Sequence, residues 1–73
     1  MENMKTQNES NEKLALYKTA RYNSDFETDV IKGEYVSIKY AGHDIRGRHY
    51  FMATTTSGRS FTAYECELTE FAL

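Results

Sequence analysis

The residue types that could form a nucleophilic site are a single cysteine and two histidines. Cys66 is the only cysteine among the 73 residues, and His43 and His49 flank a segment that begins at Asp44. A cysteine nucleophile needs a basic histidine within hydrogen-bond distance and a third group that orients that histidine. We expect Cys66 to lie on a strand, far from the loop that carries both histidines, as a half-buried side chain. The sequence therefore predicts a protein that is not an enzyme.

The same two histidines are too few for a metal site. A structural zinc site takes four ligands, and neither histidine has a second cysteine or a cluster of carboxylates beside it in the sequence. We expect neither a metal ion nor another cofactor.

A basic segment, Arg46-Gly47-Arg48-His49, could instead contact phosphate groups. Guanidinium groups can hold a nucleic-acid backbone while a neighbouring aromatic ring, such as that of Tyr50, stacks on the bases. The full set of residues for this hypothesis is Lys39, Arg46, Arg48, His49 and Arg59. Nine basic and eleven acidic side chains give the chain a net charge of −2, which opposes binding to phosphates. Nucleic-acid binding is therefore the alternative function in this interpretation.

The elements that would position these residues begin after a polar segment. Residues 1–13 are nearly all Asn, Gln, Glu, Lys, Ser and Thr, with too little apolar surface to offset the entropy lost on ordering. We expect a disordered tail at 1–13 and one domain at 14–73. A short helix from about Asn11 to Arg21 is the competing local prediction, because Leu14 and Tyr17 follow helical spacing.

Alternation of apolar and polar residues predicts strands in the rest of the chain. Val36, Ile38 and Tyr40 alternate with more polar positions, which is typical of a half-buried strand. Residues 50–56 are rich in aromatic and β-branched side chains, and a glycine turn joins them to a second strand at 60–66. These patterns predict a hairpin.

A long, exposed hairpin loop is expected at residues 41–49, with a turn at Asp44. Leu68 should then anchor the end of the chain on the core. About five short strands with turns at this spacing predict an all-β fold, in the form of a small β-barrel that closes its sheet and leaves no exposed edge. An OB-type barrel is the competing fold.

The order of four short motifs resembles the SH3 family and covers residues from about 14 to 68. The first motif looks like the start of the family's ALYDY segment, the second like its KGE turn, the third like its WWLA strand and the fourth like its distal turn. These motifs are "ALY" at 15–17, "KGE" at 32–34, "YFMA" at 50–53 and "SGR" at 57–59. The resemblance implies an SH3-like β-barrel whose long loop between the first two motifs is the RT loop, an irregular antiparallel hairpin.

The resemblance also implies which residues face a partner, since SH3 domains bind proline-rich helices between aromatic side chains and pair acidic RT-loop residues with a ligand arginine. Tyr17 matches the first ligand tyrosine of the family. However, Thr19 replaces the second ALYDY tyrosine, Tyr50 replaces the ligand tryptophan, and "TAYECEL" at 62–68 lacks the proline and the closing tyrosine of the corresponding motif. We therefore expect a divergent member whose ligand is not a proline-rich peptide.

Aromatic and acidic residues of the long loop define the expected binding surface. Burial of tyrosine and phenylalanine side chains concentrates binding energy at the centres of protein interfaces. We expect Phe26 to pin the loop onto the barrel, and Tyr22 either to do the same or to face the partner. The predicted partner-binding residues are Tyr17, Tyr22, Asp25, Glu27, Asp29 and Tyr50.

The preferred function is a protein-binding module, in the manner of a small adaptor or an inhibitor of the kind that phages and mobile elements encode. The lone cysteine and the absence of an apolar leader or an apolar run of spanning length indicate a cytoplasmic protein that does not enter a membrane. We expect a monomer or a homodimer formed through an edge strand.

Overall fold

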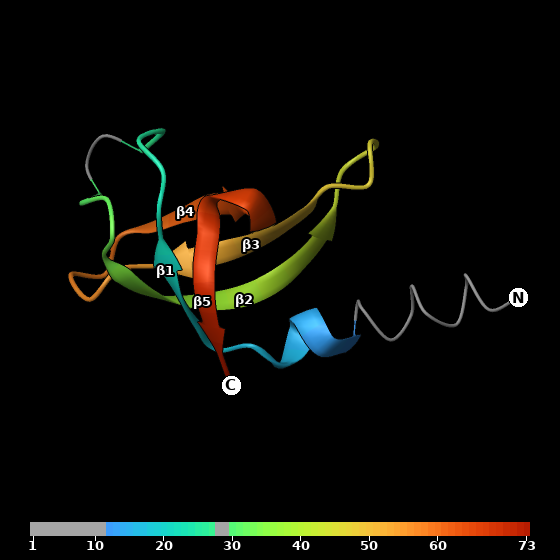
Figure 1. Cartoon of the computed structure of the whole chain (residues 1–73), viewed down its shortest axis with the longest axis horizontal. Helices are drawn as coiled ribbons and strands as arrows, with labels where there is room; N and C mark the ends of the chain where they lie inside the picture. The colour runs from blue at the N-terminus through green and yellow to red at the C-terminus, as the bar shows by residue number, and fades with distance from the viewer. Residues whose placement is uncertain (1–11, 28–29) are drawn as a thin grey trace, which may run out of the picture.

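The structure, a computed structural model, describes residues 12–27 and 30–73. Within this part of the chain, residues 12–16 form a short helix, and the remaining regular elements are one 3₁₀ helix and five strands (Figure 1). These elements are β1 (Thr19–Tyr22), β2 (Tyr35–His43), β3 (His49–Thr54), β4 (Ser60–Tyr64), the 3₁₀ helix η1 (Glu65–Glu67) and β5 (Leu68–Ala72). The predicted all-β class is confirmed.

The five strands of the described chain form one antiparallel sheet in the order β4-β3-β2-β1-β5. β1 pairs with β2, β2 with β3 and β3 with β4, and β5 crosses back to pair with β1. The register shifts between Tyr40 and Gly42 in β2 and between Thr19 and Arg21 in β1, and such irregularities bend a sheet. Among the described strands, β4 and β5 do not pair with each other, so the sheet is open and the predicted closed barrel is not confirmed.

The predicted alternation is confirmed in the two strands for which it was clearest. In β2, Val36 and Ile38 are buried while the residues between them are exposed, and in β4 the buried positions are Phe61 and Ala63. Successive side chains of a strand point to opposite faces, so this period places one face of each strand on the core.

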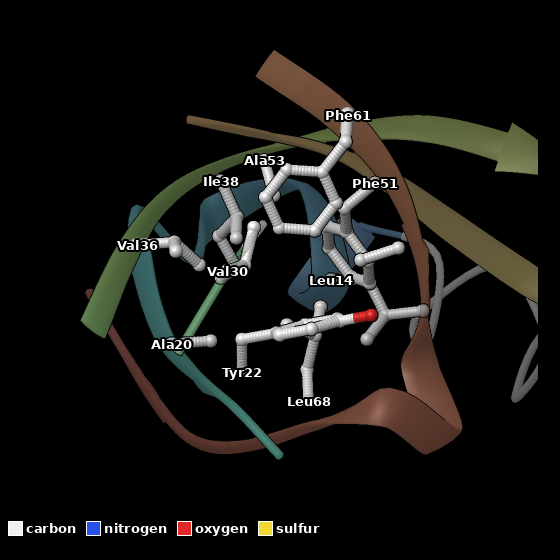
Figure 2. Close-up of a cluster of buried hydrophobic side chains, with 11 residues drawn as sticks. Leu14, Ala20, Tyr22, Val30, Val36, Ile38, Phe51, Ala53, Phe61 and Leu68 are labelled. Carbon is white, nitrogen blue, oxygen red and sulfur yellow. The ribbon is translucent and has the colours of Figure 1, made fainter. Parts of the chain in front are cut away.

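One apolar core lies within the curve of the sheet, where Figure 2 shows the side chains of several strands gathered against one another. Tyr22 and Phe51 are its largest fully buried members, and the ring of Tyr22 meets that of Phe61 edge to face at 4.9 Å between centroids. Full burial of one such side chain contributes about 1.5–3 kcal/mol. Leu68 is buried, as predicted for an anchor of the chain end. The complete core is Leu14, Ala20, Tyr22, Val30, Val36, Ile38, Phe51, Ala53, Phe61, Ala63 and Leu68.

The long loop between β1 and β2 is held by a residue that the sequence analysis missed. Val30 is buried in the core, whereas Phe26 is 77% exposed, so the prediction that Phe26 pins the loop is wrong. The loop ends at Gly33, whose φ of 95° favours glycine and whose absent side chain leaves room for the guanidinium of Arg21.

The region before β1 agrees in part with the alternative prediction of a helix. The predicted tail falls mainly on residues 1–11, which lie outside the described residues, while residues 12 and 13 belong to the helix. That helix ends at 16, and residues 19–22 are a strand, so the alternative of a helix as far as Arg21 is wrong at its end. Pairing of β1 with both β2 and β5 overrides the local helical spacing there.

Candidate functional site

The loop between β2 and β3 is organised around the carboxylate of Asp44. Oδ1 accepts hydrogen bonds from the backbone N–H groups of Arg46 and Arg48, each at 2.9 Å, and Gly47 completes the turn with a φ of 82°. The backbone hydrogen bond from Arg48 is the main reason that the pKa of Asp44 lies below its usual value. The predicted turn at Asp44 is confirmed, although β2 continues to His43 and the loop is shorter than expected.

Asp44 also fixes the guanidinium of Arg48. Its second oxygen, Oδ2, accepts a hydrogen bond from Nε of Arg48 at 2.9 Å. The guanidinium carbon lies 4.7 Å from the centroid of the Tyr64 ring, which is the geometry of a cation–π contact. The ring of Tyr50 lies on the other strand of the β3–β4 pair, 6.0 Å from Tyr64. One carboxylate and one ring thus hold a side chain that is still 56% exposed.

Three open hollows formed by described residues adjoin one another beside η1, and we call them together the η1 groove. The first, of about 380 Å³, is lined by Lys13, Leu14, Tyr17, His49, Glu65 and Phe71. The middle one, of about 140 Å³, is lined by Gly47, Arg48, His49, Tyr64, Glu65 and Cys66. The third, of about 340 Å³, is lined by Phe26, Arg48, Thr62, Tyr64, Cys66 and Glu67. The first and middle hollows share His49 and Glu65, and Arg48 lines both the middle and the third.

Glu67 of η1 ties the long loop to the groove. Its Oε2 accepts a hydrogen bond from the Ser24 hydroxyl at 2.9 Å, and its Oε1 accepts one from the backbone N–H of Tyr64 at 3.0 Å. The Ser24 hydroxyl oxygen in turn accepts a hydrogen bond from the backbone N–H of Phe26 at 3.1 Å. This chain of hydrogen bonds holds the backbone at Phe26, whose exposed ring lines the third hollow.

Comparison of the chain with protein-family models, with curated proteins and with solved structures gave no match.

The structure separates the predicted partner-binding residues. Tyr22 has no exposed surface and belongs to the core, so its assignment to the partner surface is wrong; its hydroxyl oxygen accepts a hydrogen bond from the backbone N–H of Glu27 and so fastens the loop. The Glu27 carboxylate pairs with Arg59 at 2.8 Å. Asp25 is exposed, with Lys32 at 3.6 Å, and Asp29 lies outside the described residues.

Two of the predicted aromatic residues do lie at or beside the groove. Tyr17 lines the first hollow and packs against Phe71, with ring centroids 5.1 Å apart. Tyr50 is half-buried beside Tyr64, which itself lines two hollows. Neither Tyr64 nor Phe71 was predicted, although the turn expected at Asp44 lies beside Tyr64 in the fold.

The residues predicted for nucleic-acid binding do not form one surface. Arg48 and His49 line the groove, and Arg46 lies in the same loop. Arg59 follows the opposite end of β3, in the turn at the other end of the molecule (Figure 1). A strand of this length separates the two ends by roughly 20 Å. Lys39 is exposed on β2, in register with Met52.

The structure corrects the expected environment of the cysteine. Cys66 lies in η1 and is exposed, not half-buried on a strand, because β4 ends at Tyr64. It lines the middle hollow together with His49, and Nδ1 of His49 is 2.8 Å from the hydroxyl of Tyr40. Within the described residues, no hydrogen bond joins Cys66 to a histidine.

The described residues contain no group of three or more histidine, cysteine or acidic side chains arranged to hold a metal ion. They also contain no helix that is both long enough and apolar enough to cross a membrane.

Proposed function

We propose that this protein acts by binding another protein through the η1 groove. The observation that carries the proposal is the groove itself, in which Phe26, Tyr64 and Arg48 line one continuous surface. Aromatic residues and arginine are the side chains enriched at the energetic centres of protein interfaces. Because a hydrogen bond to Asp44 already holds the side chain of Arg48, little entropy would be lost in ordering that side chain on binding.

We further propose that the chain is a divergent SH3-like protein. Three of the four motifs support this proposal by their places in the fold: "KGE" directly precedes β2, "YFMA" lies within β3, and "SGR" lies in the turn between β3 and β4. The long connection from β1 to β2 stands where the resemblance expects an RT loop. The "ALY" motif differs, since it covers the end of the helix and the residue after it.

The biological setting that we propose is the cytoplasm, with the protein acting as a small adaptor or as an inhibitor of phage or mobile-element type. A domain of this size with one continuous groove suits the masking of a partner's surface. Catalysis has no part in the proposal. Whether the protein is a monomer or pairs through an edge strand, β4 or β5, stays a prediction.

A matched pair of tyrosine variants tests the proposed function. Wild-type protein, Tyr64→Ala and Tyr35→Ala are immobilised, and lysate of the native host is passed over each, with and without nuclease treatment. Tyr35 is the control because it is an accessible tyrosine that stands at the start of β2, away from the groove. We expect Tyr64→Ala to weaken capture of a discrete protein by on the order of 2 kcal/mol, or about thirtyfold.

The result that supports the proposal is a protein that nuclease treatment leaves bound, that Tyr35→Ala retains and that Tyr64→Ala loses. Equal capture by both variants would reject the groove as the binding surface. Retention of nucleic acid alone, lost on addition of salt, would instead favour the alternative function.

A further inference from the structure

The guanidinium of Arg48 is the strongest unsatisfied donor of the η1 groove. Its Nε donates to Asp44, and among the described residues its two terminal amino groups have no hydrogen-bond acceptor. A guanidinium has five N–H donors in a planar fork that matches a carboxylate with two parallel hydrogen bonds. The open edge of this fork is therefore available to an anionic group of a ligand.

This guanidinium is also held before any ligand arrives. Asp44 holds Nε, the Tyr64 ring lies against the guanidinium at 4.7 Å, and the turn that carries both charged residues is closed by backbone hydrogen bonds. The Asp44 carboxylate and its hydrogen bond also raise the pKa of Arg48, so the positive charge is constant. A side chain fixed in this way loses less conformational entropy on binding than a free arginine would.

The two sides of Arg48 differ in their lining. On the side of the third hollow, the carboxylate of Glu67 accepts hydrogen bonds from the Ser24 hydroxyl and from the backbone N–H of Tyr64, so its oxygens are engaged within the protein. The remaining lining there is largely apolar and includes Phe26. On the other side, Glu65 lines the first and middle hollows together with His49, and Lys13 also lines the first. Each side carries one glutamate, so it is the apolar lining that makes the side of Phe26 suit a ligand with an apolar side chain next to its anionic group.

We infer that the η1 groove binds an acidic segment of a partner protein, with an aspartate or glutamate carboxylate on Arg48 and a neighbouring apolar side chain in the hollow between Phe26 and Tyr64. This inference rests on the proposed function and specifies the chemistry of the partner. The charge of this partner is opposite to that of the ligand arginine that an acidic RT loop would pair with. The reason is that Glu27 of the loop is already paired with Arg59, whereas the groove presents an arginine.

A protein carboxylate fits this site better than a nucleic-acid phosphate backbone does. Nucleic-acid affinity grows with the number of phosphates that lysine and arginine neutralise. The groove has Arg48 at its middle, whereas Arg59 lies at the other end of β3 and the chain as a whole carries a charge of −2. One fixed arginine beside an apolar hollow selects a single anionic group with an apolar neighbour.

Selection from a random peptide library displayed on phage tests the inference, with the full-length protein as bait. Selected peptides are synthesised in two forms, one with the enriched acidic residue and one with its amide, Asp→Asn or Glu→Gln. Both forms are measured against wild type, Arg48→Gln and the control Arg46→Gln, which removes an arginine of the same loop. Thermal melting of each variant checks that the fold is kept.

We expect enrichment of aspartate or glutamate next to an apolar residue, and loss of about ten- to a hundredfold in affinity when either Arg48 or the peptide carboxylate is changed. The two changes together should cost little more than one alone, because they remove the same contact. Arg46→Gln should bind as wild type does.

The outcomes separate the inference from the proposed function. Selected peptides that need Tyr64 but show no acidic residue, or that bind Arg48→Gln normally, would overturn the inference and leave the proposed function standing. A library that gives no Tyr64-dependent peptide would overturn both. Arg48-dependent binding of a single-stranded oligonucleotide, weakening steeply with salt, would also overturn both and assign the arginine to nucleic acid.

Discussion

Two clusters in this protein have the same composition, an arginine, a carboxylate and a tyrosine, but they do different work. In the first, Arg21 on β1 pairs with Glu70 on β5 at 3.0 Å, and the hydroxyl of Tyr35 on β2 donates to the same carboxylate at 3.0 Å. In the second, Arg48 pairs with Asp44 of its own turn at 2.9 Å and lies against the ring of Tyr64.

The difference lies in what the groups leave open. In the first cluster both oxygens of Glu70 are used, and Nε of Arg21 donates to the carbonyl of Gly33 at 2.9 Å. Three strands and the end of the long loop are joined, so this cluster stabilises the sheet. The second cluster is mostly local, and its guanidinium keeps an open edge above a hollow. The same three residue types therefore stabilise the fold where their hydrogen-bonding groups are paired with one another, and can bind a ligand where some of those groups stay open.

The largest expected effect is that Arg21→Gln loses thermal stability, whereas Arg48→Gln loses peptide binding. Arg21→Gln should lower the melting temperature by several degrees, because it breaks a network that joins β1, β5 and the loop, whereas an isolated exposed ion pair contributes little. Arg48→Gln should melt close to wild type and lose peptide binding. Circular dichroism melts and peptide titrations of both variants give the comparison, and a lower melting temperature for Arg48→Gln than for Arg21→Gln would contradict it.

A smaller effect is expected on the stability of the fold in acid, because each cluster lowers the pKa of its carboxyl group. The pKa of Glu70 is lowered mainly by its hydrogen bond from Arg21, and that of Asp44 mainly by the backbone hydrogen bond from Arg48. A lowered folded-state pKa gives stability that is present above the unfolded-state pKa and is lost as pH falls through the folded-state value. The loss should begin just below the ordinary values, 4.5 for Glu70 and 3.8 for Asp44.

Melting temperatures measured across this pH range for wild type, Glu70→Gln and Asp44→Asn show the two contributions. Each variant should lose less stability in acid than wild type does, and Glu70→Gln should depart from the wild-type curve at the higher pH. If the curve of melting temperature against pH for Glu70→Gln ran parallel to that of wild type, the first cluster would not lower the pKa of Glu70 in the folded state.

The smallest expected effect concerns the backbone of Glu70, whose φ of 52° lies in the left-handed region. Glu70→Ala and Glu70→Gly both remove the carboxylate, but only glycine adopts this conformation without a Cβ penalty. The glycine variant should therefore melt slightly above the alanine variant. The reverse order would indicate that the added freedom of glycine in the unfolded chain outweighs the local strain.

The strand pattern was open to prediction because it depends on neighbouring residues. Alternation around Val36 and Ile38 and the turn at Asp44 were read directly, and both are present. Where long-range pairing competes with local preference, the prediction failed: β1 replaces the expected end of a helix, and Val30 takes the anchoring place expected of Phe26.

The candidate site was only half predictable. Arg48 was selected for nucleic-acid binding and Tyr50 mainly for protein binding, and the structure shows that Tyr64 stands beside each of them. Tyr22 was assigned to the surface because its type suits an interface, yet its position on β1 directs it into the core. Composition gives the chemistry of a side chain, and only the register of its strand decides which face it occupies.

By itself, the sequence of this protein determined an all-β chain, an ordered turn at Asp44 and a supply of aromatic and charged side chains, since these depend on residues close together in the chain. The tertiary structure alone decided that Phe26, Arg48 and Tyr64 meet in one groove and that Arg21, Tyr35 and Glu70 close on one another. Such meetings depend on strand order and register, which place residues far apart in sequence at hydrogen-bond and van der Waals distance. That is the physical reason why a binding surface could be expected from this sequence but could be located only in its fold.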